Sequence, residues 1–397
     1  MRHEEILHRC FRCGYCKLPG DYSDINCPAY LRYRFESFSP GGRMWLIRAW
    51  LDGAVEADER LQEVLFSCAT CNNCVEHCIF PKFKDQILQA FIAAKEKMVE
   101  QGSLPPPVRD YLTTLYKHGN PYKMPQKKRG DWAADLGVEK YANQAYLFYI
   151  GDVGSFDERG VQIARSAAKL LGRLGASFGI LAAREGPDGN EARALGETEL
   201  FRHLAEQNIK VFKELGVEKM ITLSPHGYNA FKNDYPELGG RFQVFHYTHL
   251  LISLLTGTGI SEQPDSGPSR RVTYHDPCYL GRHNQDYETV RQILGLLPGI
   301  ELVEMGRCKA DALCCGGGGG NFFTDLVCSG PETSARVRVR EAADTGAEIL
   351  VTACPMCTVM LEDAVKSQNL EDRIQVRELS ELVTEAVFNT GRYHGHI

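Results

Sequence analysis

Short apolar segments alternate with longer amphipathic segments from residue 145 to the end of the chain. The apolar segments have the length and the β-branched or aromatic content of strands, and the amphipathic segments have helical periodicity. Five segments fit the strand pattern: Tyr146–Ile150, Lys219–Leu223, Gln243–His246, Val272–Tyr274 and Ala347–Val351. The alternation predicts α/β lobes with mostly parallel sheets.

The first hundred residues lack this alternation and contain helical runs instead. Two of the runs, Arg43–Leu51 and Lys84–Val99, have the length and periodicity of helices. We therefore expect a helical domain over residues 1–100.

Prolines interrupt the helical pattern directly after this domain, at Pro105-Pro106-Pro107, where a helix cannot continue undisturbed. The residues that follow include further prolines and the basic run Lys127-Lys128-Arg129. We interpret residues 101–144 as a linker, extended over Gly119–Asp135, and the basic run as solvated rather than as a docking site.

The two α/β regions carry related sequences. The segment Val351–Cys357 aligns with Ile221–Gly227, 130 residues earlier, and each segment ends a predicted strand and begins a predicted helix. A repeat of this length predicts two pseudo-symmetric α/β lobes, over residues 145–262 and 263–397. The whole chain is then an α+β multidomain protein.

The first copy of the repeat contains no cysteine at the positions where the second copy has them. In the first lobe, Cys278 corresponds to Asp152, the pair Cys314-Cys315 to the window 186–189, Cys354 to Ser224, and Cys357 to Gly227. A thiolate-bound metal cluster is therefore possible in the second lobe and not at the matching place in the first.

The chain has 15 cysteines in 397 residues, and 13 of them fall into three groups. Two groups lie in the helical domain, with the spacings C-x2-C-x2-C-x10-C-P and C-x2-C-x2-C-x3-C. They consist of Cys10, Cys13, Cys16 and Cys27, and of Cys68, Cys71, Cys74 and Cys78. Bacterial ferredoxins have the same spacing of cysteines, in which three close cysteines bind one cubane cluster and the fourth ligates the other cluster.

By this cross-over we predict two [4Fe-4S] clusters. One is held by Cys10, Cys13, Cys16 and Cys78, and the other by Cys68, Cys71, Cys74 and Cys27. Zinc and disulfides are the alternatives. Zinc sites use pairs of cysteines rather than triplets, and a disulfide scaffold needs a secreted chain, whereas residues 1–17 do not resemble a signal peptide.

The third group consists of Cys278, Cys314, Cys315, Cys354 and Cys357. Two members directly follow predicted strands, and the carboxyl ends of parallel strands meet at one edge of a sheet, so the five thiolates can converge. Five sulfurs exceed the need of a cubane, and adjacent cysteines suit a larger cluster better than a single tetrahedral ion.

The glycine run Gly316–Gly320 follows the cysteine pair directly. It lacks the Gly-Lys-Ser/Thr ending of a phosphate loop, and no G-x-G-x-x-G opens a βαβ unit elsewhere. We expect its backbone to pass close to the cluster and to direct amide hydrogens at the sulfurs. Binding of flavin or NAD by this chain is not expected.

Composition limits the partners and the cellular location that we expect for the protein. The 45 basic and 51 acidic residues give a net charge of −6, which argues against a nucleic-acid partner. Apolar stretches stay well below the 18 residues that a membrane helix needs. Cysteine-ligated clusters need reduced thiols, so we expect a cytoplasmic protein, held at the inner face of a membrane only through a partner.

For the other residues near the cysteines, we expect structural rather than catalytic roles. We expect Cys308 and Cys328 to be buried spare cysteines. His275 and His283 could protonate a departing thiolate, but bonding within a loop is favoured for both. His226, in the cysteine-free lobe, has no evident catalytic partner.

The motifs together resemble one known family. The C-terminal half is similar to the cysteine-rich CCG domains of heterodisulfide reductase D and B subunits, and the N-terminal half to the ferredoxin segment of D subunits. The similarity rests on the two N-terminal cysteine runs, residues 274–282, Cys314-Cys315-Gly316 and Cys354-Pro355-Met356-Cys357. Similar oxidoreductases occur in the sulfite-reduction-associated membrane complex, in electron-transferring-flavoprotein-linked quinone reductases and in the tungsten benzoyl-CoA reductase complex.

The resemblance implies a function as well as a fold. In this family, the five CCG cysteines hold a non-cubane [4Fe-4S] cluster at which a disulfide is cleaved between paired domains, which maps a catalytic role onto Cys278, Cys314, Cys315, Cys354 and Cys357. Here one of the paired sites is lost. We therefore expect an electron-transfer subunit of an anaerobic oxidoreductase complex; the alternative is a thiol–disulfide reductase acting at the single CCG cluster. The implied partners are a flavoprotein, an electron-transferring flavoprotein, an acyl-CoA enzyme or a membrane cytochrome b subunit.

Overall fold

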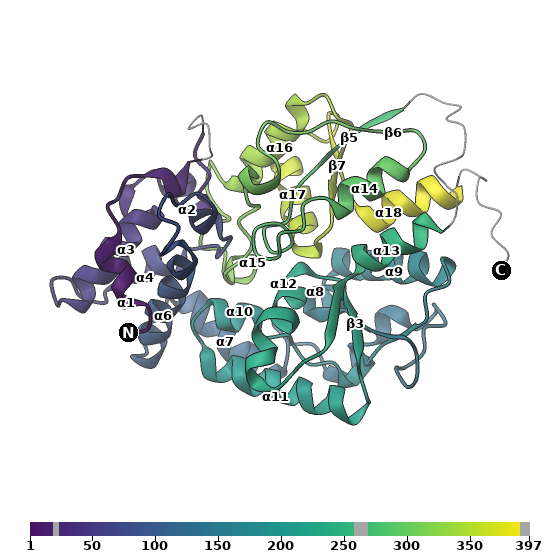
Figure 1. The fold of residues 1–397 in the computed structure, drawn as a ribbon, viewed down its shortest axis with the longest axis horizontal. Helices are drawn as coiled ribbons and strands as arrows, with labels where there is room; N and C mark the ends of the chain where they lie inside the picture. Colours follow the sequence, from purple (N-terminus) through teal and green to yellow (C-terminus); the bar gives the residue numbers. More distant parts are fainter. Residues whose placement is uncertain (19–23, 258–268, 390–397) are drawn as a thin grey trace.

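The computed structural model describes residues 1–18, 24–257 and 269–389. A helical N-terminal domain lies beside two α/β lobes, and the first lobe lies below the second in the view of Figure 1. The predicted fold class is confirmed. The boundary expected between the lobes, at residues 262 and 263, lies outside the described residues.

The N-terminal domain consists of short helices separated by the cysteine loops. Side chains cap two of them, since Ser39 accepts a hydrogen bond from the backbone N–H of Gly42 at 3.0 Å and Asp58 accepts one from Leu61 at 2.9 Å. The helices are α1 (Glu4–Arg9), α2 (Pro28–Tyr33), α3 (Pro40–Leu51), α4 (Glu59–Phe66), α5 (Asn73–Glu76) and α6 (Ile87–Glu100).

Part of the expected linker, residues 101–144, is helical. The prolines begin a helix, α7 (Pro106–His118), because proline fits the first turn of a helix, whereas the preceding helix α6 already ends at Glu100. Arg129 of the basic run is 1% exposed and pairs with Asp152 and Glu185 of the first lobe. Only Lys127 and Lys128 are solvated as predicted. A buried ion pair cannot be recognised from a basic run, since both signs of charge come together only on folding.

Each lobe contains a four-stranded parallel sheet, and the two sheets have the same topology. The strand order is β2-β1-β3-β4 in the first lobe and β6-β5-β7-β8 in the second. The strands are β1 (Tyr146–Tyr149), β2 (Phe178–Gly179), β3 (Lys219–Thr222), β4 (Gln243–His246), β5 (Arg270–Tyr274), β6 (Ile300–Leu302), β7 (Ile349–Thr352) and β8 (Gln375–Glu378). The shared order agrees with the sequence repeat.

The strands that the apolar pattern did not predict all lie at sheet edges. They are β2, with two residues, β6, with three, and β8, with the sequence Gln-Val-Arg-Glu. Edge strands are often short and polar, since one side of the backbone has no neighbouring strand. The central strands, in contrast, are buried on both faces and have the apolar runs that the sequence shows.

Helices connect the strands and pack the lobes together. Those of the first lobe are α8 (Gly151–Phe156), α9 (Glu158–Arg173), α10 (Asn190–Ala194), α11 (Thr198–Glu214), α12 (Pro225–Asn229) and α13 (Tyr247–Thr256); those of the second are α14 (Thr289–Leu296), α15 (Asn321–Thr324), α16 (Ser334–Asp344), α17 (Pro355–Ser367) and α18 (Leu379–Thr384). Between the lobes, Arg159 of α9 contacts Glu362 of α17 at 2.7 Å and Glu381 of α18 at 2.5 Å.

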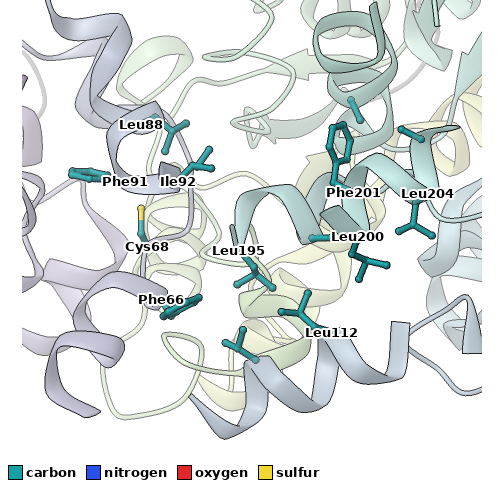
Figure 2. Packing of buried hydrophobic residues seen from close by; sticks show 14 of the residues in the cluster. Phe66, Cys68, Leu88, Phe91, Ile92, Leu112, Leu195, Leu200, Phe201 and Leu204 are labelled. Carbon is teal, nitrogen blue, oxygen red and sulfur yellow. The ribbon is translucent and has the colours of Figure 1, made fainter. Parts of the chain in front are cut away.

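The N-terminal domain shares a hydrophobic core with the first lobe. Figure 2 shows Phe66 and Cys68 of the cysteine region and Leu88 of α6 on one side, with Leu195 and Leu200 of the first lobe on the other. This shared core fixes the cysteine loops of the N-terminal domain against the two lobes. Among the helices of the described residues, none is long and apolar enough to cross a membrane.

Candidate metal centres

The structure gathers four cysteines at the surface of the N-terminal domain, which we call the distal set. Cys10, Cys13, Cys16 and Cys78 line one cavity, together with the apolar side chains of Met44 and Ile87. The positive φ of Gly14, +88°, turns the chain between Cys13 and Cys16. Cys13 is exposed, so this set is the one nearest to solvent.

A second set, which we call proximal, lies deeper. Cys27, Cys68, Cys71 and Cys74 are between 7% and 9% exposed. Burial raises the pKa of Cys74 well above its usual value, and Cys68, Cys16, Cys71 and Cys27 raise it further. Four thiols this close, none of them in a disulfide, fit the ligand set of a metal cluster better than a structural core.

Two buried cations stand beside the proximal set. Arg43 is 1% exposed and lowers the pKa of Cys27 against the larger effect of burial. Lys95 of α6 donates hydrogen bonds to the carbonyl oxygens of Cys68, at 3.4 Å, and Ala194, at 3.1 Å. Burial lowers the pKa of Lys95 to about 8. The sequence analysis missed both residues, which lie within predicted helices and have no motif of their own.

The third set brings together all five cysteines of the second lobe. Their exposed fractions run from 0% for Cys354 to 5% for Cys278. The Sγ atoms of Cys314 and Cys278 lie 3.7 Å apart, and those of Cys315 and Cys357 lie 3.4 Å apart. These distances are too long for disulfides, and they suit thiolates that share a metal cluster. The donor set therefore fits the predicted iron–sulfur centre.

The proximal and third sets touch each other. Cys71 and Cys314 pack in one buried cluster, and Cys314 is the largest of the influences that lower the pKa of Cys71 to about 6. Arg282 supports the junction, because its Nε donates to the Cys71 carbonyl at 2.8 Å and its Nη1 donates to the Ala312 carbonyl at 2.6 Å.

The glycine run passes along this junction. The amide of Gly316 donates to Sγ of Cys314 at 3.3 Å, as expected for an amide directed at a sulfur. The next glycines approach the N-terminal domain: a Cβ on Gly318 would lie 2.6 Å from the Ala69 oxygen, and one on Gly319 would lie 2.3 Å from the Cys68 oxygen. The run is therefore packed against the loop that carries the proximal cysteines.

His283 has the structural role that the sequence analysis favoured. Its Nε2 lies 2.8 Å from the Thr70 carbonyl oxygen, and its ring stacks on Tyr279 with centroids 4.1 Å apart. His275 is different, because a ring nitrogen lies within 4.8 Å of the sulfurs of Cys315 and Cys357. Arg338 Nε donates to its Nδ1 at 3.3 Å, which orients the ring toward these cysteines.

Cys308 and Cys328 do not belong to any of the three sets. Both are half-buried, which corrects the expectation of full burial. The thiol of Cys328 lies near the backbone oxygens of Gly316, at 3.9 Å, and Asn321, at 3.6 Å.

The first lobe has acidic residues, a serine and a glycine in the region where the second lobe has cysteines. Asp152, at the position of Cys278, pairs with Arg129, and Glu185 accepts hydrogen bonds from the amides of Ile150 and Gly151 at 3.0 and 2.8 Å. A small cavity lies among Asp152, Asp188 and Ser224 and reaches Met356 of the second lobe. Within the part of the chain that the structure describes, no thiol lines this cavity.

His226, for which the sequence shows no evident catalytic partner, pairs with a buried carboxylate in the structure. Its Nδ1 lies 2.6 Å from Oε1 of Glu191, and it lines one small cavity with Pro355 and Met356, the neighbours of Cys354 in the second lobe. Burial opposes protonation, but Glu191 and Cys354 together raise the pKa of His226 well above its usual value. The repeat contained a signal, since His226 occupies the place of Met356 beside the cluster cysteines.

Comparison with family models agrees with this division of the chain. Residues 6–80 match the 4Fe-4S dicluster domain, and residues 155–232 and 272–362 match the cysteine-rich CCG domain. The CCG model matches both lobes, including the first lobe, which has no cysteine at the site.

Several relatives are similar along most of the chain. The "Probable iron-sulfur-binding oxidoreductase FadF" of Bacillus subtilis is 34% identical over 339 residues, which are 82% of this chain and 47% of the relative. The "EtfAB:quinone oxidoreductase" of Syntrophomonas wolfei is 29% identical over 96% of this chain and 58% of its own length. The chain thus spans about half the length of these two relatives.

A third relative has nearly the same extent as this chain. The D-type polypeptide of the dihydromethanophenazine:CoB–CoM heterodisulfide reductase of Methanosarcina barkeri is 29% identical over 407 residues, which are 96% of this chain and 94% of the relative.

Proposed function

Because the chain belongs to the family of iron–sulfur proteins that join a 4Fe-4S dicluster domain to CCG cysteine-rich domains, we propose that it is an electron-relay subunit of an oxidoreductase complex. The distal and proximal sets each hold one cubane cluster, with the cross-over of Cys27 and Cys78, and the third set holds a non-cubane cluster. Clusters of this kind, when bound, accept and release single electrons.

The contact between Cys71 and Cys314 carries this proposal. The two thiols belong to different sets, yet they pack in one buried cluster and Cys314 lowers the pKa of Cys71. This contact brings the proximal set against the third set. Arg282 and the glycine run hold the two loops in this position.

The exposure of the cysteines gives the relay an outer and an inner end. Cys13 is exposed, the proximal cysteines are nearly buried, and Cys354 of the third set is 0% exposed. Phe11, two residues from Cys13, is 74% exposed and offers an apolar contact for a partner. Electrons from a protein donor therefore enter at the distal set and continue inward.

Burial of the third set favours a relay over disulfide chemistry. A substrate sulfur would have to reach one of five cysteines that are at most 5% exposed. The cavity of the first lobe comes close, at Met356, but no cysteine of the described residues lines it. The partner is then a second redox protein, such as a flavoprotein, an acyl-CoA enzyme or a membrane cytochrome b subunit.

A kinetic comparison of two electron donors tests the relay. Reduced flavodoxin is large and needs a docking surface, whereas dithionite is small and can deliver electrons from any part of the surface that lies near a cluster. In the Cys13→Ser variant, reduction of the third cluster by flavodoxin should slow at least about tenfold, because the exposed end of the relay is altered. Reduction by dithionite should remain close to that of the unaltered protein.

Two results would contradict the relay. The first is an equal rate with flavodoxin in both proteins, which would show that electrons bypass the distal set. The second is turnover of a small disulfide by the unaltered protein with dithionite as donor, which would favour a thiol–disulfide reductase.

A further inference from the structure

The first lobe has no cysteine at its site, but one of its side chains, His226, lies beside the third set. His226 lies in the first turn of α12, which follows β3, just as Met356 lies in the first turn of α17, which follows β7. The two helix starts line one small cavity, at His226 and at Pro355, which places the histidine of one lobe beside Cys354 of the other. His226 is 6% exposed, and Cys354 is 0% exposed.

Three contacts orient the imidazole of His226. Glu191 of α10 lies 2.6 Å from Nδ1, and Asn190 Nδ2 lies 3.2 Å from the same atom. The ring stacks on Tyr279 with centroids 4.0 Å apart and an interplanar angle of 27°. With Nδ1 held by the carboxylate, Nε2 is the nitrogen left to donate toward Cys354.

Glu191 itself is fixed from two sides, which makes the arrangement rigid. It is 7% exposed, and its second oxygen accepts a hydrogen bond from the amide of Gly320 at the end of the glycine run. A carboxylate that orients a histidine toward a metal centre is a common way to tune that centre. Here the carboxylate and the histidine come from one lobe and the metal ligand from the other.

We propose that His226, oriented by Glu191, is a positioning residue that donates a hydrogen bond to the Cys354 thiolate and so raises the reduction potential of the third cluster. An added electron increases the negative charge on the ligand sulfurs, and an N–H donor stabilises that charge. The first lobe then acts as the regulator of a cluster that it does not bind. This inference rests on the proposed function, in which Cys354 ligates that cluster.

The test is a redox titration of anaerobically prepared variants, followed by electron paramagnetic resonance. The double variant H226F/E191Q keeps a ring on Tyr279, removes the N–H donor and leaves no unpaired buried carboxylate. At a fixed mediator potential near the midpoint, its third cluster should show at least about a tenfold lower ratio of reduced to oxidised form. The other two clusters should titrate as in the unaltered protein. The single variant E191Q should shift less, because the donor remains.

His249→Phe is the matched control, since His249 also pairs with a carboxylate, Asp286, at 2.8 Å but hydrogen-bonds no cysteine of the described residues. An unchanged ratio in H226F/E191Q with full iron content would overturn the inference and leave the relay intact. Loss of the third cluster's iron in H226F/E191Q alone would overturn it as well, since His226 would then be a ligand. Absence of that iron from the unaltered protein would instead refute the proposed function.

Discussion

Gly319 shows how a single residue can fix the distance between two domains. Its φ of +64° lies in the left-handed region, and a Cβ there would lie 2.3 Å from the carbonyl oxygen of Cys68. A side chain would therefore force the glycine run away from the proximal loop, and the contact of Cys71 with Cys314 would open.

Replacing Gly319 with alanine tests this tight approach. We expect G319A to lose at least about 2 kcal/mol of unfolding free energy, from backbone strain and from the clash with Cys68. Denaturant unfolding followed by tryptophan fluorescence measures the loss.

Gly172 provides the control for this substitution. It lies inside helix α9 and is exposed, and a Cβ at this position would meet no atom of the described residues within 4 Å outside its own helix and chain neighbours. G172A should therefore gain up to about 1 kcal/mol. Equal stability of G319A and the unaltered protein would show that the loop has room to move.

At the scale of elements, the two lobes repeat the same junction between an edge strand and a helix. In the first lobe β4 ends at His246, which begins α13; in the second, β8 ends at Glu378, which begins α18. Both residues form a capping box with the third residue of the helix. Glu378 also accepts a hydrogen bond from the hydroxyl of Tyr247 in α13, so the cap of one lobe binds the matching helix of the other.

The carboxyl group of Glu378 makes the lobe interface sensitive to pH. Burial raises the pKa of Glu378 to about 7, although Ser380 and Tyr247 lower it in part. The folded protein therefore binds more protons than the unfolded chain between about pH 4.5 and pH 7, and its stability falls as the pH rises through this window.

The variant E378Q should lack this loss of stability. Between pH 5.5 and pH 8, the unaltered protein should lose about 1–3 kcal/mol relative to E378Q. Thermal unfolding at several pH values measures the difference, with E371Q, at an exposed position of the same lobe, as control. Parallel curves for E378Q and the unaltered protein would show that Glu378 does not titrate in this range.

At the scale of the molecule, the three cysteine sets form a series that crosses domain boundaries. Cys27 and Cys68 are distant in sequence, yet both belong to the buried proximal set. Cys16 of the distal set lies near the proximal set, because Cys27 as well as Cys10 raises its pKa.

Serine at Cys27 tests the cross-over between the two N-terminal motifs. We expect the anaerobically prepared protein to contain about 12 irons, four per cluster. Cys27→Ser should change the paramagnetic resonance signal of the same cluster as Cys74→Ser, and not that changed by Cys13→Ser. A match of Cys27→Ser with Cys13→Ser would reverse the assignment, and about 8 irons in the unaltered protein would leave one set empty.

The sequence alone determined the three cysteine groups and the central strands, because both are local. A thiolate triplet must wrap one cluster within a few residues, so Cys68, Cys71 and Cys74 are recognisable from their spacing. A strand buried on both faces needs a continuous apolar run, as in β3 and β7. The edge strand β8 lacks such a run, and the pattern missed it.

Only the tertiary structure decided which of these local features meet. Arg129 became a buried partner of Asp152, and His226 became a partner of Cys354, because the N-terminal domain and the two lobes pack against one another. The contact of Cys71 with Cys314 joins residues more than 200 positions apart. No periodicity or spacing encodes such pairs, since each pair depends on how the N-terminal domain and the two lobes pack against one another.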